Sequence, residues 1–237
     1  MTNYKTLLQS EIPEYETKLP SSGKVVKYRP FLVKEEKILL LSKQNGDRKD
    51  QLSAIENIIS SCCNIRKIDS LPLVDVEHIF LELRKKSIGE VVDLNFNCPE
   101  TKEKIKVSLD LNDICTTNLS KKKTISLTGS KKILLKEYTF GDFKKSFSFV
   151  ETKFDEIVFL MSKLETQTEV IDCESLNTKQ KNEILDNLLP ADYNKIIKEN
   201  DKVVRHEHRV KYQTQLGEEK TLLIRGLFDF FCLPSAI

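Results

Sequence analysis

The hydrophobic period changes halfway through the stretch from Glu16 to Ser42, and this change constrains the fold more than any other sequence feature. Residues 25–29 mix apolar and basic side chains after the turn-forming residues 20–23, a pattern typical of a strand. After Pro30 the spacing becomes helical, with two glutamates in the first turn, where carboxylates suit the positive end of the helix dipole. The stretch therefore predicts a turn, a strand and a buried helix in succession.

Helical patterns continue to Gly89. A break at Asn45–Asp47 separates the first helix from a second, predicted over about 48–63, and a third follows Pro72. The period then becomes two, which predicts a hairpin over 90–110 with the sequence CPETKEK as its turn.

The second half alternates between strand and helix patterns. Further strands are predicted at 123–128 and 132–138. Helical spacing then runs from Phe143 to Met161, and 164–178 is predicted to be a loop. Asn177 can cap the next helix, and Pro190 ends that helix or starts another. Strands are predicted at 204–212 and 222–224, with a turn at Gly217 between them.

These elements predict an α+β fold with an N-terminal helical lobe, an antiparallel β insertion, a second helical segment and closing β-strands. We expect four regions, and the last should pack with the second as one domain. They are an extended N-terminal arm over 1–24, a strand and three-helix lobe over 25–89, the β insertion over 90–139, and helices with a C-terminal hairpin over 140–237.

The composition disfavours several classes of protein. The 237 residues, 39% of them hydrophobic, suffice for a sizeable core. The net charge is only +2, and 7 of the 38 basic residues are Arg, the residue of bidentate phosphate and guanine recognition, so no specific nucleic-acid partner is expected. No run of about 18 apolar residues and no signal-peptide pattern occurs, so no membrane partner is expected either.

The six cysteines do not form a metal-binding pattern. None is spaced C-x-x-C, and we expect free thiols in a reducing cytosol. Cys62 and Cys63 end an apolar helix and are interpreted as small core residues. Cys98 stands alone in a turn where a zinc knuckle would carry two cysteines. The sequence therefore predicts no metal and no cofactor.

The three histidines give little support for catalysis. His206 and His208 are predicted on the solvated face of an edge strand, and His78 is interpreted as a satisfied helical residue. No catalytic or nucleotide-binding motif is present. We expect a protein that is not an enzyme and has no small-molecule substrate.

Two further stretches have alternative interpretations. The lysines between Lys121 and Lys136 indicate either nucleic-acid binding or a solvated or partner-facing edge, and the lack of Arg and aromatic residues favours the edge. In the terminal sequence GLFDFFCLPSAI we assign Leu227, Phe228 and Phe231 to the core and the last few residues to a partner contact.

The stretch LPSSGKVVKYRPFLVKEEKILLL, residues 19–41, resembles the N-terminal signature of the baseplate hub subunit family of T-even-type contractile-tailed bacteriophages. The resemblance continues more loosely through LPLVDVEHIFLELRKKSIGEVVDLNFNC, residues 71–98, and GLFDFF, residues 226–231, is similar to the family's closing segment. Many relatives have a paired-cysteine knuckle where this chain has only Cys98, and this departure argues against a zinc site here.

The resemblance implies a non-enzymatic structural or assembly protein of the central baseplate hub, in the virion or in the host cytoplasm during assembly. Its partners would be other hub proteins. The contact candidates are Tyr4, Tyr15 and Leu19 in the arm, Cys98 and Pro99 at the hairpin tip, and Leu233, Pro234 and Ile237 at the C-terminal end.

Three alternatives stay open on sequence grounds. The first is an assembly chaperone that is absent from the mature virion and makes similar contacts. The second is a cytosolic enzyme with an unrecognised carboxylate or thiol site, which a pocket with shifted acidity would reveal. The third is a lysine-driven nucleic-acid binder, whose affinity should fall steeply with salt.

Overall fold

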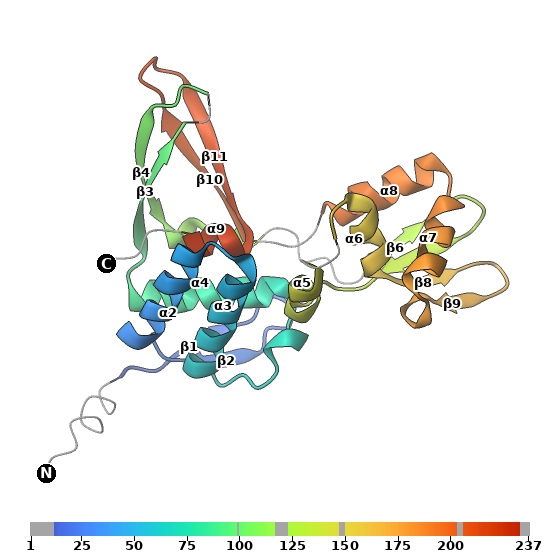
Figure 1. The fold of residues 1–237 in the computed structure, drawn as a ribbon, viewed down its shortest axis with the longest axis horizontal. Helices are drawn as coiled ribbons and strands as arrows, with labels where there is room; N and C mark the ends of the chain where they lie inside the picture. The colour runs from blue at the N-terminus through green and yellow to red at the C-terminus, as the bar shows by residue number, and fades with distance from the viewer. Residues whose placement is uncertain (1–11, 99, 117–122, 147–149, 203–205, 233–237) are drawn as a thin grey trace, which may run out of the picture. The chain divides into compact units, whose positions relative to one another are not determined.

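The computed structural model describes residues 12–98, 100–116, 123–146, 150–202 and 206–232, and the chain divides into two compact units (Figure 1). Unit 1 consists of Met1–Ile68, Val74–Thr117 and Arg205–Ile237, and unit 2 consists of Asp69–Leu73 and Asn118–Val204. Helices and antiparallel sheets occur in both units, which confirms the predicted α+β class. Three short 3-10 helices accompany them: η1 (Ile68–Ser70), η2 (Leu111–Asp113) and η3 (Cys173–Ser175).

Unit 1 begins with a two-stranded ribbon. Strand β1 (Tyr15–Lys18) pairs antiparallel with β2 (Val25–Tyr28), and Leu19 and Gly23 close the turn between them through a main-chain hydrogen bond of 2.8 Å. Residues 15–18, which the sequence predicted as part of an arm, are therefore strand residues held against β2. Of the rest of that predicted arm, residues 1–11 lie outside the described part of the chain.

Three helices follow, close to the predicted boundaries: α2 (Val33–Asn45), α3 (Arg48–Cys62) and α4 (Leu73–Ser87). Gly46 ends α2 with a φ of 72°, a left-handed conformation that glycine adopts without steric cost. Asp47 then caps α3 by accepting a hydrogen bond from the Lys49 N–H. The fully buried side chains of α3 and α4 form much of the core: Leu52, Ile55, Ile58, Ile59, Ile79, Phe80 and Leu83.

Helix α2 buries carboxylates. Glu35 and Glu36 are 4% and 8% exposed. One Glu35 oxygen accepts a hydrogen bond of 2.8 Å from the Leu32 N–H, and the other lies 3.1 Å from the guanidinium of Arg29. Burial opposes the ionisation of Glu35, but the hydrogen bonds from Leu32 and Arg29 outweigh it and lower the pKa of this carboxyl. The first turn of α2 is thus fixed by a buried, ionised side chain.

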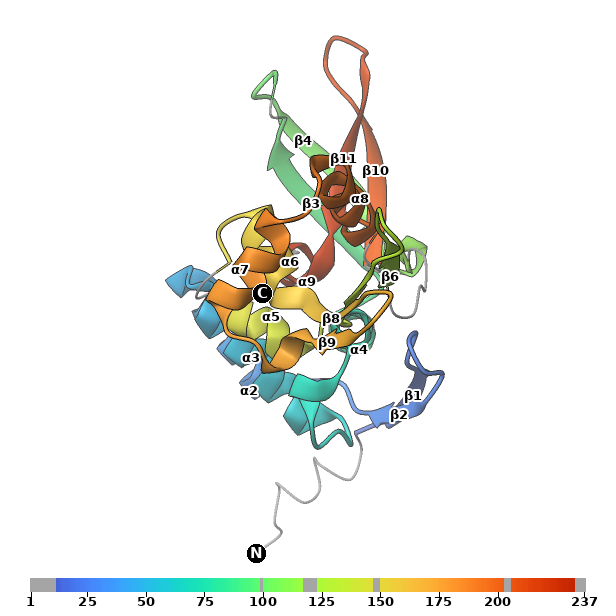
Figure 2. The same cartoon turned by 90° about the vertical axis from the view of Figure 1, so that its right-hand side faces the viewer.

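Two β-hairpins of unit 1 project side by side from its helices (Figures 1 and 2). Strand β3 (Val91–Asn97) pairs with β4 (Lys104–Asp110) in the predicted hairpin. Strand β10 (His206–Gln213) pairs with β11 (Glu219–Arg225) on one edge and with β5 (Cys115–Thr116) on the other. A small apolar cluster of Cys98, Ile105 and Tyr212 joins the two hairpins, and helix α9 (Gly226–Cys232) follows β11.

Unit 2 contains a four-stranded antiparallel sheet in the order β6-β7-β8-β9. Its strands are β6 (Lys123–Ser126), β7 (Lys132–Leu135), β8 (Met161–Glu165) and β9 (Val170–Asp172). Its helices are α5 (Phe140–Ser146), α6 (Lys153–Leu160), α7 (Thr178–Asp186) and α8 (Pro190–Asn200). Asn177 caps α7 and Pro190 opens α8, as the sequence predicted.

Two predictions for unit 2 are wrong. The continuous helical face expected from Phe143 to Met161 is divided, because Thr152 forms a capping box with Asp155 and starts a new helix there. The loop expected over 164–178 contains β9 and the end of β8. Strand β8 was missed because its sequence, MSKLE, is polar over most of its length and short, so apolar alternation was not visible.

The buried position of Glu35 gives a stability prediction. Replacing Glu35 with alanine should lower the free energy of unfolding by about 2–3 kcal/mol, because Leu32 and Arg29 lose a charged, buried acceptor. Urea denaturation followed by circular dichroism measures the change. Lys34→Ala is the matched control. Lys34 also pairs with Glu35, at 3.4 Å, but its side chain is 68% exposed, so the loss should stay below about 1 kcal/mol. Equal losses for the two variants would contradict this account of α2.

Candidate functional site

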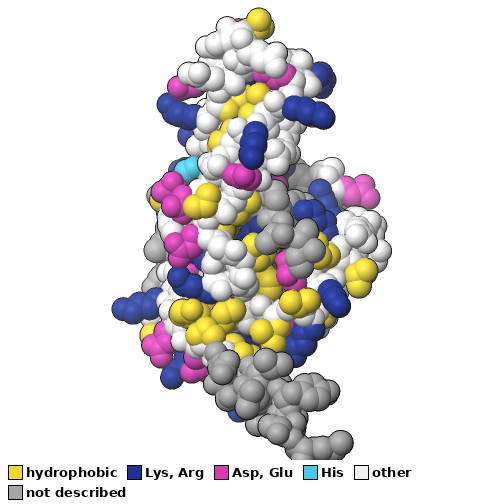
Figure 3. Space-filling view, turned by 90° about the vertical axis from the view of Figure 1, so that its left-hand side faces the viewer, with side chains coloured by type: hydrophobic (Ala, Val, Ile, Leu, Met, Phe, Trp, Pro, Cys, Tyr) yellow, Lys and Arg dark blue, Asp and Glu magenta, His cyan; other side chains and the backbone are white. Residues whose placement is uncertain are grey.

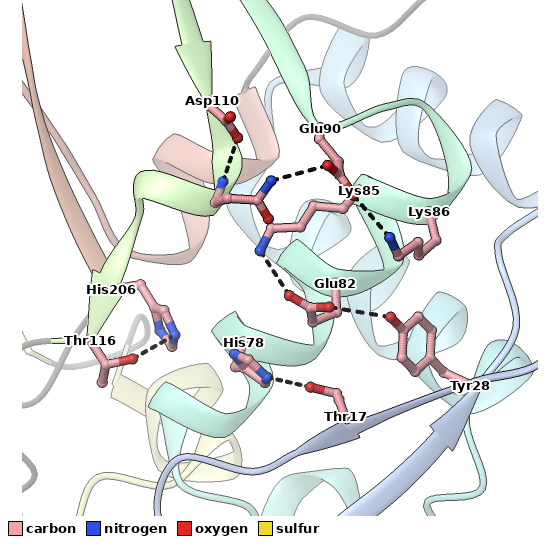
Figure 4. Close-up of polar contacts among 11 residues, drawn as sticks. Thr17, Tyr28, His78, Glu82, Lys85, Lys86, Glu90, Asp110, Thr116 and His206 are labelled. Carbon is pink, nitrogen blue, oxygen red and sulfur yellow. Dashed lines mark hydrogen bonds and ion pairs between the residues drawn. The ribbon is translucent and has the colours of Figure 1, made fainter.

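Helix α4 carries most of the buried polar contacts of unit 1. On the side that faces β1 and β2, Asp75 accepts two hydrogen bonds from Ser21, one from the main-chain N–H at 2.9 Å and one from the hydroxyl at 2.5 Å. One turn further along, His78 Nε2 lies 2.7 Å from the Thr17 hydroxyl (Figure 4). The N-terminal ribbon is therefore fastened to the first half of α4.

The second half of α4 holds the continuation of this ribbon. The Tyr28 hydroxyl donates to Glu82 Oε2 at 3.2 Å, and Lys85 pairs with the other oxygen of Glu82 at 2.8 Å (Figure 4). The Ser87 hydroxyl accepts from the Phe31 N–H at 2.9 Å. Burial and the Glu82 carboxylate raise the pKa of Tyr28, so its hydroxyl remains a donor.

Glu77 holds the C-terminal part of unit 1 to the same helix. Its Oε2 accepts from the main-chain N–H of His206 at 3.0 Å and lies 3.3 Å from His206 Nδ1. His206 Nε2 lies 3.1 Å from the Thr116 hydroxyl. Gly226 begins α9 with a φ of 77°, and a Cβ at this position would lie 3.5 Å from the other oxygen of Glu77. We call Asp75, Glu77, His78, Glu82 and Ser87, with the side chains and N–H groups they bind, the α4 clasp.

The chain Glu77–His206–Thr116 has the order of a carboxylate, an imidazole and a hydroxyl, which is the order of a hydrolase triad. Burial argues against that chemistry. The side chains of Glu77 and His206 are 1% and 3% exposed, and one carboxylate oxygen serves both the ring and the main chain of His206. This arrangement holds the start of β10 in place.

The imidazoles of His78 and His206 stack within the clasp, with ring centroids 5.7 Å apart. Burial, followed by the neighbouring His206, lowers the pKa of His78 to about 4. His78 is therefore neutral at pH 7 and satisfied by Thr17, as the sequence predicted. The prediction for His206 was wrong, because the residue lies on the central strand of its sheet and is only 2% exposed.

Three thiols of unit 1, those of Cys62, Cys63 and Cys98, are poorly suited to chemistry. Cys62 is buried, as predicted, and Cys63 is half-buried. Burial raises the pKa of Cys62 to about 11 and that of Cys63 to about 12. Hydrogen bonds from Thr101 lower the pKa of Cys98 to about 7, but its side chain is fully buried, with the sulfur 3.5 Å from the Tyr212 hydroxyl.

The contact candidates named from the sequence do not form one surface among the described residues. Tyr15 is half-buried, with its ring 5.8 Å from that of Tyr28, whereas Leu19 and Cys98 are buried within unit 1. A role in partner binding stays a prediction for all of them. The remaining candidates lie outside the described residues: Tyr4, Pro99, Leu233, Pro234 and Ile237.

Unit 2 has an apolar groove of about 460 Å³ beside α7. It is lined by Lys131, Leu164, Thr166, Ile171, Leu176, Gln180, Glu183, Ile184, Asn187 and Leu188. Another depression, of about 490 Å³, lies in unit 1 near Arg29 and Cys63. Neither combines a nucleophile with a base of matched acidity, so both suit packing or docking better than catalysis.

Within the described ranges, no group of three or more His, Cys, Asp or Glu side chains is arranged to hold a metal ion. None of the helices described is long and apolar enough to cross a membrane.

Sequence reasoning missed the clasp itself. The sequence assigned no partner to Asp75, and nothing in the sequence pairs Glu77 with a residue 129 positions away. The available signal was the presence of carboxylates on more than one face of a helix with an apolar stripe. Such residues need partners when the helix is buried.

The depressed pKa of His78 predicts a pH-dependent stability. The folded protein keeps His78 neutral down to about pH 4, whereas the unfolded chain takes up a proton near pH 6.5. Stability is therefore complete above pH 6.5 and falls as the pH drops towards 4, by about 2 kcal/mol at pH 5. Urea denaturation between pH 8 and pH 5 measures the slope. His78→Gln, whose amide can still bond Thr17, should remove most of it, and an unchanged slope in this variant would contradict the assignment.

Comparison with known proteins assigns the family. A family described as T4 bacteriophage base plate protein matches residues 12–232, which include nearly all of both units. Neither a curated protein nor a solved structure matches the chain significantly. Because the match extends over most of the 237 residues, the chain belongs to the T4 bacteriophage base plate protein family.

Proposed function

We propose that this chain is a non-enzymatic structural or assembly protein of the central hub of the baseplate. Family membership gives it a role in the phage tail baseplate and implies contacts with other baseplate proteins. The proposal narrows this role to the hub and to binding rather than catalysis. It takes other hub proteins as the partners, in the virion or in the host cytoplasm during assembly.

The observation that carries the proposal is the meeting of three separate sequence blocks at α4. Residues 19–41, 71–98 and 226–231 are the blocks that resemble the hub subunit family. Ser21 and Phe31 from the first block bond to Asp75 and Ser87 of the second, and Gly226 from the third lies against Glu77. The three blocks that carry the resemblance therefore contact one another at α4.

The use of the polar groups supports binding rather than catalysis. Within the clasp, the carboxylate of Glu77 and the imidazole of His206 are buried. Both form hydrogen bonds within unit 1, so they are not available to a substrate. When hydrogen bonds hold distant segments together, the surface they form exists before binding. Such a preformed surface loses less conformational entropy when a partner binds.

Mass spectrometry separates the structural role from the assembly role. Purified mature virions and tail intermediates from infected cells are compared for peptides of this chain. Presence in both, at a fixed ratio to other hub proteins, is expected for a structural subunit. Presence only in the intermediates identifies an assembly chaperone. Absence from both would overturn the proposal and reopen the enzyme and nucleic-acid alternatives.

Deletion of residues 234–237 tests the proposed contact at the C-terminal end. Hub assembly should weaken, as measured by the yield of complete tails, while the urea midpoint of the truncated protein stays unchanged. A lowered midpoint would assign these residues to the core instead.

A further inference from the structure

The polarity of helix α2 is reversed relative to an ordinary surface helix. The residues it buries are Glu35, Glu36, Leu39 and Ser42. A surface helix normally turns its apolar stripe to the core and its charged residues to water. In α2 the carboxylates face inward, where Glu35 is fixed by Arg29 and the Leu32 N–H.

The solvent-facing side of α2 carries three apolar residues among lysines. Val33, Ile38 and Leu41 are 59%, 43% and 61% exposed. Figure 3 shows hydrophobic side chains open to solvent on the helical part of unit 1, below the projecting hairpins. The neighbouring helix α3 differs, because its exposed positions include Ser53, Asn57 and Ser60. Single exposed apolar residues are ordinary on protein surfaces, but three on one face of a 13-residue helix form a patch.

The charged residues that α2 itself exposes are all lysines. Lys34 and Lys37 are exposed, and both carboxylates of α2 are buried. Val33, Lys37 and Leu41 are spaced by four residues, so they lie in one row along the helix. The row therefore alternates apolar, cationic and apolar.

We propose that this α2 face, defined by Val33, Lys34, Lys37, Ile38 and Leu41, binds an amphipathic helix of another baseplate protein. That helix would present apolar side chains with carboxylates between them. The inference rests on the proposed function and adds the location of a contact and the chemistry of the partner. Helices with apolar anchors at spacings of three and four residues are a recurring mode of recognition.

The row disfavours a second copy of the same face as the occupant. A second copy of the same face would bring Lys37 against lysine, and like charges facing each other across an interface are repulsive. The carboxylates of an acidic helix would pair with Lys37 instead.

Site-specific photocrosslinking in infected cells tests the inference. A benzophenone amino acid replaces Leu41 on the α2 face, or Asn57 on the exposed side of α3 as the control position. After irradiation, mass spectrometry identifies the peptide joined to each site. The expected result is a crosslink at position 41, and none at 57, to an apolar helical segment of a baseplate protein with Asp or Glu among its apolar residues.

Substitutions provide the quantitative test. With that segment as a synthetic peptide, fluorescence anisotropy should show at least tenfold weaker binding for Val33→Gln/Leu41→Gln and for Lys37→Glu. Leu216→Gln is the matched control, since Leu216 is 79% exposed at another place in unit 1 and its loss should not matter. All these positions are exposed, so the urea midpoints should stay unchanged.

Several outcomes would overturn the inference. They are crosslinks only to a second copy or to phospholipid, equal yields at positions 41 and 57, a partner segment without carboxylates, or full binding by the α2 variants. The proposed function fails separately. If the chain is missing from virions and tail intermediates alike, its hub role is wrong, whereas its presence there without a contact at α2 leaves that role standing and removes only the α2 face.

Discussion

The buried carboxylates of α4 are the constraint on which the rest of unit 1 depends. A carboxylate removed from water needs hydrogen bonds or opposite charge, and removing a partner from such a group is costly. Asp75 and Glu77 lie two residues apart, so they project from different sides of the helix, and each binds a segment distant in sequence. As a result, the N-terminal ribbon and the start of β10 are both held to one helix.

This arrangement explains how one body forms from three separate parts of the chain. Residues 118–204 form most of unit 2, and in the sequence they lie between the segment that ends with β5 and the segment that begins with β10. The pairing of His206 with Thr116 on adjacent strands, and with Glu77 on α4, brings the chain back to unit 1 at a fixed register. Closing a loop between residues 129 positions apart costs conformational entropy. Strong, buried and specific contacts have to offset this cost.

Helix α2 shows how a local rule can fail. Its two glutamates fit the helix dipole, and the sequence predicted a helix there correctly. The expectation that this helix is buried was wrong, because Val33, Ile38 and Leu41 are exposed. The direction in which the helix faces depends on Arg29, whose guanidinium holds Glu35 inside. With the acidic side turned inward, Val33, Ile38 and Leu41 of the same helix face solvent, and a partner of opposite charge pattern is the proposed complement.

The sequence by itself determined the local elements: the helices at 33–45, 48–62 and 73–87, the hairpin at 91–110, the cap at Asn177 and the helix start at Pro190. These depend on periodicity and turn chemistry, which act over a few residues. Only the tertiary structure decided the burial of His206, the partners of Asp75 and Glu77, the strand β8 in a polar segment, and the outward apolar face of α2. Each of these depends on which distant group supplies a hydrogen bond or covers a surface, and local sequence patterns do not encode that choice.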